Sequence, residues 1–426
     1  MSDVFAGFLL ARPSGVPVLL RRDPGVKTFR ITVLWRRPIG PMHAARAMLP
    51  ALLQHGTRAH ANRPALARAR ERLFSANVGM GFSRHAEQSV LRLSADAVSA
   101  SFLPGEPDQF GSVQELMLEQ ATRSRLLAPG LPLEVFERER AQALADARAI
   151  KEDRGRQARL SAVLQACQGE PYGVPEHGGE AAISAVAMPD PPAALRDFLQ
   201  HGEMTVLLAG ALPDEPERKL LPFLTSLPTS RPEPLLPPVQ PPLRQARTIR
   251  ETAPMQQAKV VLVLRAPVPD SPARLCALQV AMSLWGGGPH SRLFTEVREK
   301  RSLCYYASAG GDADKGLLLV QSGCGADSVA AVGEESMRQL AEIGAGRFSA
   351  AELATSIAVS QGPLRSIDDA PGARLSYTAE QFLRGFDETP EQRIASLGAV
   401  GREAVCEAAS AIWLDVDYAL LPEGGP

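Results

Sequence analysis

Residues 29–35 read FRITVLW, and residues 258–264 read AKVVLVL. Each run is short, apolar and rich in β-branched residues, a composition that predicts a buried strand. Ile31 and Val260, which hold equivalent places in the two runs, are 229 residues apart. The two runs therefore indicate that one structural unit occurs twice along the chain.

The segments that follow the two runs support this duplication. Each run is followed by an apolar helix, a polar helix, a further strand and, much later, a closing strand. In the first copy these pieces are 44–54, 64–74, a strand from near Val78, and 204–208. In the second copy they are 273–285, 291–300, a strand from near Cys304, and 418–421. Because several strands succeed one another without alternating helices, we expect an α+β fold: two homologous halves, each a mostly antiparallel sheet packed with helices, forming a clamshell.

The middle of the chain carries the clearest boundary. Ten of the thirty residues of 213–242 are proline, a composition that predicts a stiff, extended connector. The predicted division is an N-terminal half over 1–212, a proline-rich linker over 213–242 and a C-terminal half over 243–426. The charged, alanine-rich stretch 133–168 is typical of a pair of surface-packed helices.

Composition excludes several classes of protein. The chain has 426 residues, 45% of them hydrophobic and 22% charged, with a net charge of −1. These values are ordinary for a soluble globular protein and predict neither nucleic acid nor membrane as a partner. Five scattered cysteines lack C-x-x-C spacing, and the N-terminus has no basic start before its apolar stretch. We therefore expect a cytoplasmic protein in a reducing compartment.

Most local motifs give no support for chemistry. There is no G-x-S-x-G, and the triple glycine 286–288 follows a helix without a later G-K-[ST], so it is typical of a helix cap. His43, His55 and His60 lie close together, but no acidic residue occurs from Ile39 to Arg70. The interpretation is surface or loop histidines rather than zinc ligands.

The sharpest local feature is the stretch 286–306, GGGPHSRLFTEVREKRSLCYY. Arg298 lies late on a predicted helix, and Tyr305 follows seven residues later where a strand begins. A guanidinium and a phenol at the same end of a sheet offer directional donors for a peptide carbonyl or an oxyanion. On residue chemistry alone, a solvated charged helix end and a half-buried strand tyrosine explain the same letters.

At this stretch the chain resembles the pitrilysin/insulinase-type metallopeptidases, the inverzincins, which include the mitochondrial processing peptidases. The duplicated halves and the central linker extend the resemblance over nearly the whole chain. In that family an arginine and a tyrosine seven apart bind substrate and assist catalysis, and that register falls on Arg298 and Tyr305, not Tyr306. The resemblance also implies substrate binding by Gly286, Gly287 and Gly288, a shorter form of a glycine-rich stretch.

The first half departs from the family at its metal motif. Active members carry H-x-x-E-H a few residues before a Gly-Thr, and alignment on Gly56-Thr57 places that motif on 47–51, AMLPA. Ala47, Pro50 and Ala51 thus replace the two histidines and the glutamate, and the distal acidic ligand would fall on Asp146. No metal is therefore expected in this chain.

The resemblance implies a subunit that is inactive alone. Some bacterial members work as pairs, in which one subunit carries H-x-x-E-H and its partner carries the Arg/Tyr pair. We expect this chain to be the substrate-binding subunit of such a heterodimeric zinc endopeptidase, with zinc in the partner. One alternative is a peptide-binding or structural protein without proteolytic function. Another is an active enzyme with a remade zinc site from His43, His55 and Asp146.

Overall fold

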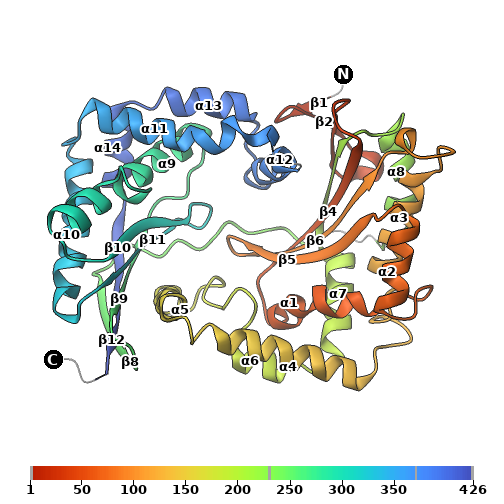
Figure 1. Ribbon diagram of the computed structural model, residues 1–426, viewed down its shortest axis with the longest axis horizontal. Coiled ribbons are helices and arrows are strands. Elements are labelled where there is room, and N and C mark those ends of the chain that lie inside the picture. Colours follow the sequence, from red (N-terminus) through yellow and green to blue (C-terminus); the bar gives the residue numbers. More distant parts are fainter. Residues whose placement is uncertain (1–2, 229–231, 370–371, 424–426) are drawn as a thin grey trace. The chain divides into compact units, whose positions relative to one another are not determined.

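The computed structural model describes residues 3–228, 232–369 and 372–423 (Figure 1). The chain divides into two compact units, each containing one β-sheet. The first unit comprises Met1–Arg148, Val174–Pro237 and Gly372–Leu383. The second comprises Ala149–Gly173, Pro238–Pro371 and Arg384–Pro426. Each unit therefore contains a segment from the opposite half of the sequence.

The sheet of the first unit has seven strands in the order β1-β2-β3-β7-β4-β6-β5. All neighbouring strands are antiparallel except β3 and β7, which are parallel. The strands are β1 (Asp3–Phe5), β2 (Phe8–Ala11), β3 (Val18–Arg22), β4 (Thr28–Pro38), β5 (Asn77–His85), β6 (Gln88–Val98) and β7 (Glu203–Gly210).

The sheet of the second unit has five strands in the order β10-β11-β9-β12-β8, again with a single parallel pair, β12 and β8. The strands are β8 (Arg247–Ala253), β9 (Ala258–Arg265), β10 (Tyr306–Asp312), β11 (Leu317–Cys324) and β12 (Trp413–Pro422). Taken from β8 to β10, this order repeats that of β3, β7, β4, β6 and β5 strand for strand. The parallel pair β8 and β12 then corresponds to the parallel pair β3 and β7. The predicted α+β fold of two homologous, mostly antiparallel halves is confirmed.

One face of the first sheet packs on helices from its own half of the sequence. Phe29, Ile31, Val33 and Trp35, which alternate along β4, point into this core. The helices that the first half contributes to this unit are α1 (His43–Leu52), α2 (Arg63–Arg72), α3 (Gln109–Thr122), α4 (Leu133–Ala149), α6 (Glu180–Ala185), α7 (Asp190–His201) and α8 (Pro216–Ser226). The apolar helix predicted at 44–54 and the polar helix predicted at 64–74 correspond to α1 and α2.

The other face of the first sheet is covered by a helix from the far end of the chain. Leu375 and Ala379 of α12 (Ala373–Arg384) share a buried cluster with Leu34 and Leu207 of the sheet. Figure 1 shows α12 beside the hairpin of β1 and β2. A helix from the C-terminal half thus completes the core of the first unit.

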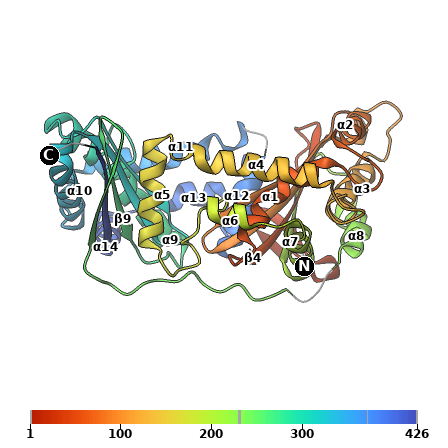
Figure 2. The same ribbon diagram turned by 90° about the horizontal axis from the view of Figure 1, so that it is seen from below.

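The second unit shows the reverse arrangement. Along β9, Val260 and Leu262 face one cluster, whereas Val261 and Val263 face another. The first cluster packs on helices of the C-terminal half, namely α9 (Pro272–Gly286), α10 (Val329–Gly344), α11 (Ala350–Arg365), α13 (Pro390–Gly398) and α14 (Arg402–Ser410). The second cluster packs on α5 (Arg154–Ala166), which comes from the N-terminal half and lies along the sheet in Figure 2.

The stretch 133–168, predicted to be a surface-packed pair, is thus two helices with different surroundings. Most of α4 is half-buried or exposed, and Phe136 is its buried residue. In α5, Ala158, Ala162 and Ala166 are fully or almost fully buried. The small side chains at spacings of four residues let the helix lie close to the sheet, which makes α5 a core element.

The proline-rich segment is only partly extended. Residues Pro216–Ser226 form α8, with Pro216 in the first turn and Pro222 inside the helix, whereas no helix or strand occurs between 232 and 246. The prediction of an extended connector over 213–242 is wrong for α8. Leu220, Phe223 and Leu224 are buried in the first core, and this burial offsets the cost of an internal proline.

A buried ion-pair network closes one end of the second sheet. Asp415 is the extra residue of a bulge in β12, and its carboxylate accepts hydrogen bonds from Arg244 at 2.7 Å and Arg265 at 3.0 Å. Arg265 also pairs with Glu170 at 2.7 Å, and Lys315 pairs with Glu170 at 2.6 Å. The network thus links Arg244, which precedes β8, and Glu170, which follows α5, to the sheet. Its members in the sheet are Arg265 at the end of β9, Asp415 in β12 and Lys315 between β10 and β11.

Replacing Asp415 with alanine is expected to destabilise the protein by about 3–5 kcal/mol, because it leaves the buried guanidinium of Arg265 short of a partner. The matched control is Asp417→Ala on the same strand, whose pair with Arg250 is partly exposed and contributes less than about 1 kcal/mol. Chemical denaturation of both variants measures the difference. Equal losses for the two variants would contradict a special role for the network.

The same network predicts loss of stability in acid. Burial raises the pKa of Asp415, but the hydrogen bonds and charges of Arg244 and Arg265 outweigh it and hold the pKa below its usual value. The folded pKa therefore lies below the unfolded value of about 3.9. The stabilisation is complete above the unfolded pKa and is lost as the pH falls through the folded pKa. Urea denaturation at a series of pH values should show this loss, reduced in Asp415→Ala.

Candidate functional site

Arg298 is carried by an unusual helix. Residues Leu293–Lys300 form a π-helix, η4, in which Leu293 and Val297 are buried. The guanidinium of Arg298 lies over the ring of Phe294, 4.5 Å from its centroid, and its ion pair with Glu299 is long at 3.8 Å. Its side chain is 39% exposed. π-Helical turns occur frequently at functional sites, and the aromatic ring holds this cation without neutralising it.

Tyr305 lies just before the edge strand β10. The backbone amide of Leu303 donates to the carbonyl of Val297 at 3.1 Å, which folds the chain back after η4. The amide of Tyr305 then donates to the carbonyl of Gly323 at 2.8 Å. Arg298 and Tyr305 therefore stand at the two ends of one short turn, and Cys304 between them is buried.

The structure distinguishes Tyr305 from its neighbour. Tyr305 is 61% exposed, and within the described residues its hydroxyl has no hydrogen-bond partner. The ring of Tyr306 instead packs on Gly323, where an added Cβ would lie 2.5 Å from the ring. Lys259 lies 5.4 Å from the centroid of the Tyr306 ring. Tyr305 is therefore the more exposed of the two tyrosines, since Tyr306 is 40% exposed and has one face of its ring on Gly323.

The three glycines after α9 have different surroundings. A Cβ on Gly286 would lie 2.5 Å from the backbone nitrogen and the Cβ of Ala309, so this glycine allows α9 to pack on β10. Gly287 is exposed. Gly288 adopts φ +143°, a conformation that side chains disfavour, and an added Cβ would be in ordinary contact with the His290 ring at 3.7 Å. Gly287 and Gly288 thus present accessible backbone, whereas Gly286 has a packing role of its own.

The positions aligned with the metal motif form part of a helix packed in the core. Met48, Leu49 and Leu52 of α1 are buried, with Ala47 and Pro50 half-buried beside them. Ala51 is exposed. Asp146 on α4 is also exposed, and its carboxylate accepts a hydrogen bond from Gln142 at 2.8 Å. None of the side chains at 47–51 is a zinc ligand of the usual types.

The three residues proposed for a remade site have other partners. The His43 ring contacts Ser89 at 3.1 Å and the Glu176 carbonyl at 2.8 Å, and burial lowers the pKa of this histidine. His55 pairs with Glu139 at 2.9 Å. Among the residues 3–228, 232–369 and 372–423, no group of three or more His, Cys, Asp or Glu side chains is placed to hold a metal ion. His43, predicted to lie on the surface, is buried, because β6 and the segment before α6 enclose it.

We expect the purified chain to contain no stoichiometric zinc, because its aligned motif offers no ligand and both ring nitrogens of His43 already have partners. Elemental analysis after dialysis against a weak chelator measures the zinc content. Tightly bound zinc at one equivalent, lost in His43→Ala or His55→Ala, would instead support the remade site.

Comparison with known proteins identifies the domain type of one part of the chain. Residues 193–359 match the family model described as "Peptidase M16 inactive domain". Over these residues the chain therefore contains a domain of the peptidase M16 inactive type. The predicted resemblance to the pitrilysin/insulinase-type metallopeptidases is thus confirmed.

Individual relatives extend the similarity over most of the chain. It is 24% identical over 388 residues to YmfF of Bacillus subtilis (strain 168), described as a probable inactive metalloprotease, with 88% of each chain covered. A conserved protein from Enterococcus faecalis V583 has the same fold, with a TM-score of 0.88 and 23% identity over 96% of this chain and 97% of that one. A peptidase M16 inactive domain from Pseudomonas fluorescens gives a TM-score of 0.77 and 20% identity, covering 99% of this chain and 98% of that one.

Sequence reasoning located the aligned positions but missed several features of their surroundings. The π-helical form of η4 was not predicted. The packing of Tyr306 on Gly323 has no local signal, because it depends on the pairing of β10 with β11. The burial of His43 was also missed. The apolar residues around it, in 44–53, were the one available signal that this part of the chain lies in the core.

Proposed function

We propose that this chain is the non-catalytic, substrate-binding subunit of a heterodimeric zinc endopeptidase that degrades or processes peptides. The observation that carries the proposal is the contrast between two places in the chain. The positions aligned with the metal motif on α1, Ala47, Pro50 and Ala51, offer no zinc ligand and no base. Arg298 and Tyr305, by contrast, are exposed without strong partners among the described residues. The guanidinium and the phenol lie beside a strand without strong partners, so they contribute little to the stability of the fold and are suited to binding a ligand.

The chemistry assigned to each residue follows from its donors. Arg298 keeps its charge at every physiological pH and offers hydrogen bonds to a peptide carbonyl. The hydroxyl of Tyr305 adds a second, directional donor, and together they would stabilise negative charge as it develops on the carbonyl oxygen. The exposed backbone of Gly287 and Gly288 would contact the peptide chain. Zinc held by an H-x-x-E-H subunit would supply the activated water.

The proposed setting is the cytoplasm, with no nucleic acid or membrane as partner. All five cysteines are free thiols and four of them are buried, which suits a reducing compartment. The net charge of −1 gives no broad basic surface for polyanions. No helix among the described residues has the length and apolar character needed to span a bilayer.

Co-expression with an H-x-x-E-H homologue from the same genome tests the proposal. We expect a co-purifying complex that cleaves an unfolded peptide, whereas each subunit alone does not. A complex that binds peptide without cleaving it would favour the second candidate, a peptide-binding protein with no proteolytic role. If no complex forms and the mixture gains no activity, the proposed pairing is wrong.

A further inference from the structure

The first unit buries several polar atoms that have no hydrogen-bond partner among the described residues, on α12 and on the sheet that it covers. On α12 these atoms are Oγ1 of Thr378 and Oε1 of Gln381, whose side chains are fully or almost fully buried. On the sheet they are Oγ1 of Thr205 in β7 and Nε of Arg36 in β4. All four atoms are closed to water in the folded chain.

At least three of these side chains lie on the surfaces that α12 and the sheet present to each other. Thr378 is one helical turn from Leu375, which shares a buried cluster with Leu34 of β4. Thr205 is the cross-strand partner of Leu34, and Arg36 lies two residues further along β4. Cross-strand partners and alternate residues of a strand point to the same face of a sheet. Thr205 and Arg36 therefore point to the face that α12 covers.

These atoms weaken the interface that buries them. A buried polar atom without a partner has lost its hydrogen bonds to water and gained none in exchange. If α12 leaves the sheet, such atoms regain water. The helix opposes this movement with a small apolar face. Leu375 and Ala379 belong to the buried cluster, and the Phe382 ring packs edge-on against Phe5 with centroids 5.4 Å apart.

The two ends of α12 are suited to movement. Gly372 has φ +83° just before the helix, and Gly385 has φ +75° just after it. Glycine adopts such angles without steric cost, and residues at the ends of an element absorb the rotation when that element moves. The segment of the first unit that carries α12, Gly372–Leu383, also begins and ends where the chain changes from one unit to the other.

We propose that α12 is a detachable cover of the first unit, which leaves the sheet and returns while both sheets stay folded. Its departure uncovers an apolar face that includes Phe8, Leu19, Leu34 and Leu207. The buried apolar side chains of α12 favour the closed state, and the unpartnered polar atoms raise the population of the open one. The proposal does not depend on the proposed peptidase pairing.

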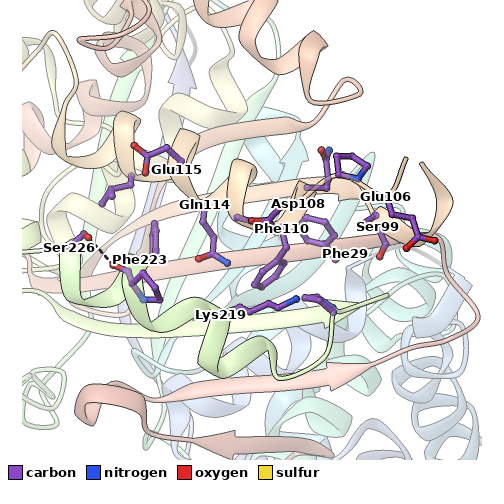
Figure 3. Close-up of a pocket in the computed structure, with 17 residues that line it drawn as sticks. Phe29, Ser99, Glu106, Asp108, Phe110, Gln114, Glu115, Lys219, Phe223 and Ser226 are labelled. Carbon is purple, nitrogen blue, oxygen red and sulfur yellow. Dashed lines mark hydrogen bonds between the residues drawn. The ribbon is translucent and has the colours of Figure 1, made fainter. Parts of the chain in front are cut away.

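The opposite face of the same sheet provides a matched control. The helix α3 packs there, with Phe110 and Met117 in the other core of the unit. Gln114 of α3 also has a buried atom without a partner among the described residues, Nε2, and its side chain is labelled at the pocket between α3 and α8 in Figure 3. Removing this atom should stabilise the unit as a whole without changing how often α12 leaves the sheet.

Hydrogen exchange of the full chain, followed by mass spectrometry, measures the opening of each helix. The amides of α12 are expected to exchange at least about tenfold faster than those of α5, which has no unpartnered buried side-chain atom among its described residues. Thr205→Val and Thr378→Val nearly keep the side-chain shape and remove the polar atom. Each should slow exchange in α12 by about tenfold, whereas Gln114→Leu should leave it unchanged.

Three results would overturn the proposal. The first is exchange in α12 as slow as in α5. The second is exchange in α12 that both valine substitutions leave unchanged or accelerate, since the polar atoms would then not weaken the interface. The third is a Gln114→Leu variant that slows α12 as much as Thr378→Val does, because α12 would then open only when the whole unit unfolds.

Discussion

Expressed as separate chains, residues 1–212 and 243–426 are expected to be insoluble or molten, although each contains an entire β-sheet. The second piece lacks α5, so one face of its sheet loses its cover. The first piece lacks α12, which covers one face of its sheet, and also α8, which packs in the core on the other face. In the second piece Val261, Val263, Leu319 and Leu420 would be exposed together. Fully burying each such side chain contributes about 1.5–3 kcal/mol, and a patch of this kind promotes association.

The matched experiment keeps α5 and α12 available. Pieces 1–242 and 243–426, expressed together, are expected to form a soluble complex, since each piece then carries the helix that the other sheet needs. Solubility, circular dichroism and cooperative melting distinguish the two cases. A soluble, cooperatively melting 243–426 on its own would show that α5 is dispensable for the second core.

In the active pair, Arg298→Ala and Tyr305→Phe are each expected to lower kcat by about a hundredfold or more, the effect of losing one donor to a developing oxyanion. Both side chains are partly or largely exposed, so neither change should unfold the chain or release the partner. Steady-state kinetics on an unfolded peptide measures kcat and KM, and gel filtration measures the complex.

The chain offers close controls for both changes. Tyr306→Phe removes a hydroxyl from the tyrosine that packs on Gly323 and should leave turnover unchanged. Lys300→Ala removes a charge from the same helix end, where its partner is Glu296 at 2.7 Å. If Arg298→Ala and Tyr305→Phe behave like these controls, the pair has no role in turnover.

Much of the fold could be predicted from patterns of neighbouring residues in the sequence. The short apolar runs rich in β-branched residues at 29–35 and 258–264 predicted buried strands, and the recurrence of the same order of elements predicted two copies. Both features depend on residues close together in the chain, so the sequence carries a signal for them. The alignment that placed Ala47, Pro50 and Ala51 on the metal motif rested instead on the resemblance to a known family.

The helix within the proline-rich segment shows where local pattern is insufficient. The prolines of 213–242 predicted extended chain, yet Leu220, Phe223 and Leu224 lie on one face of α8 and reach the core. Proline in the first helical turn costs no hydrogen bond, and burial outweighs the second proline. Local propensity is a weak preference that tertiary packing overrides.

The sequence by itself determined that the chain has two related α+β halves and that it contains no H-x-x-E-H motif. The assignment of Arg298 and Tyr305 came from the family resemblance and stays a prediction. Only the tertiary structure decided that α5 and α12 each complete the core of the unit built mainly from the other half. The physical reason is that each of these depends on which surfaces meet across more than a hundred residues of chain or between neighbouring strands. Periodicity shows that a face is apolar, but it does not show what covers that face.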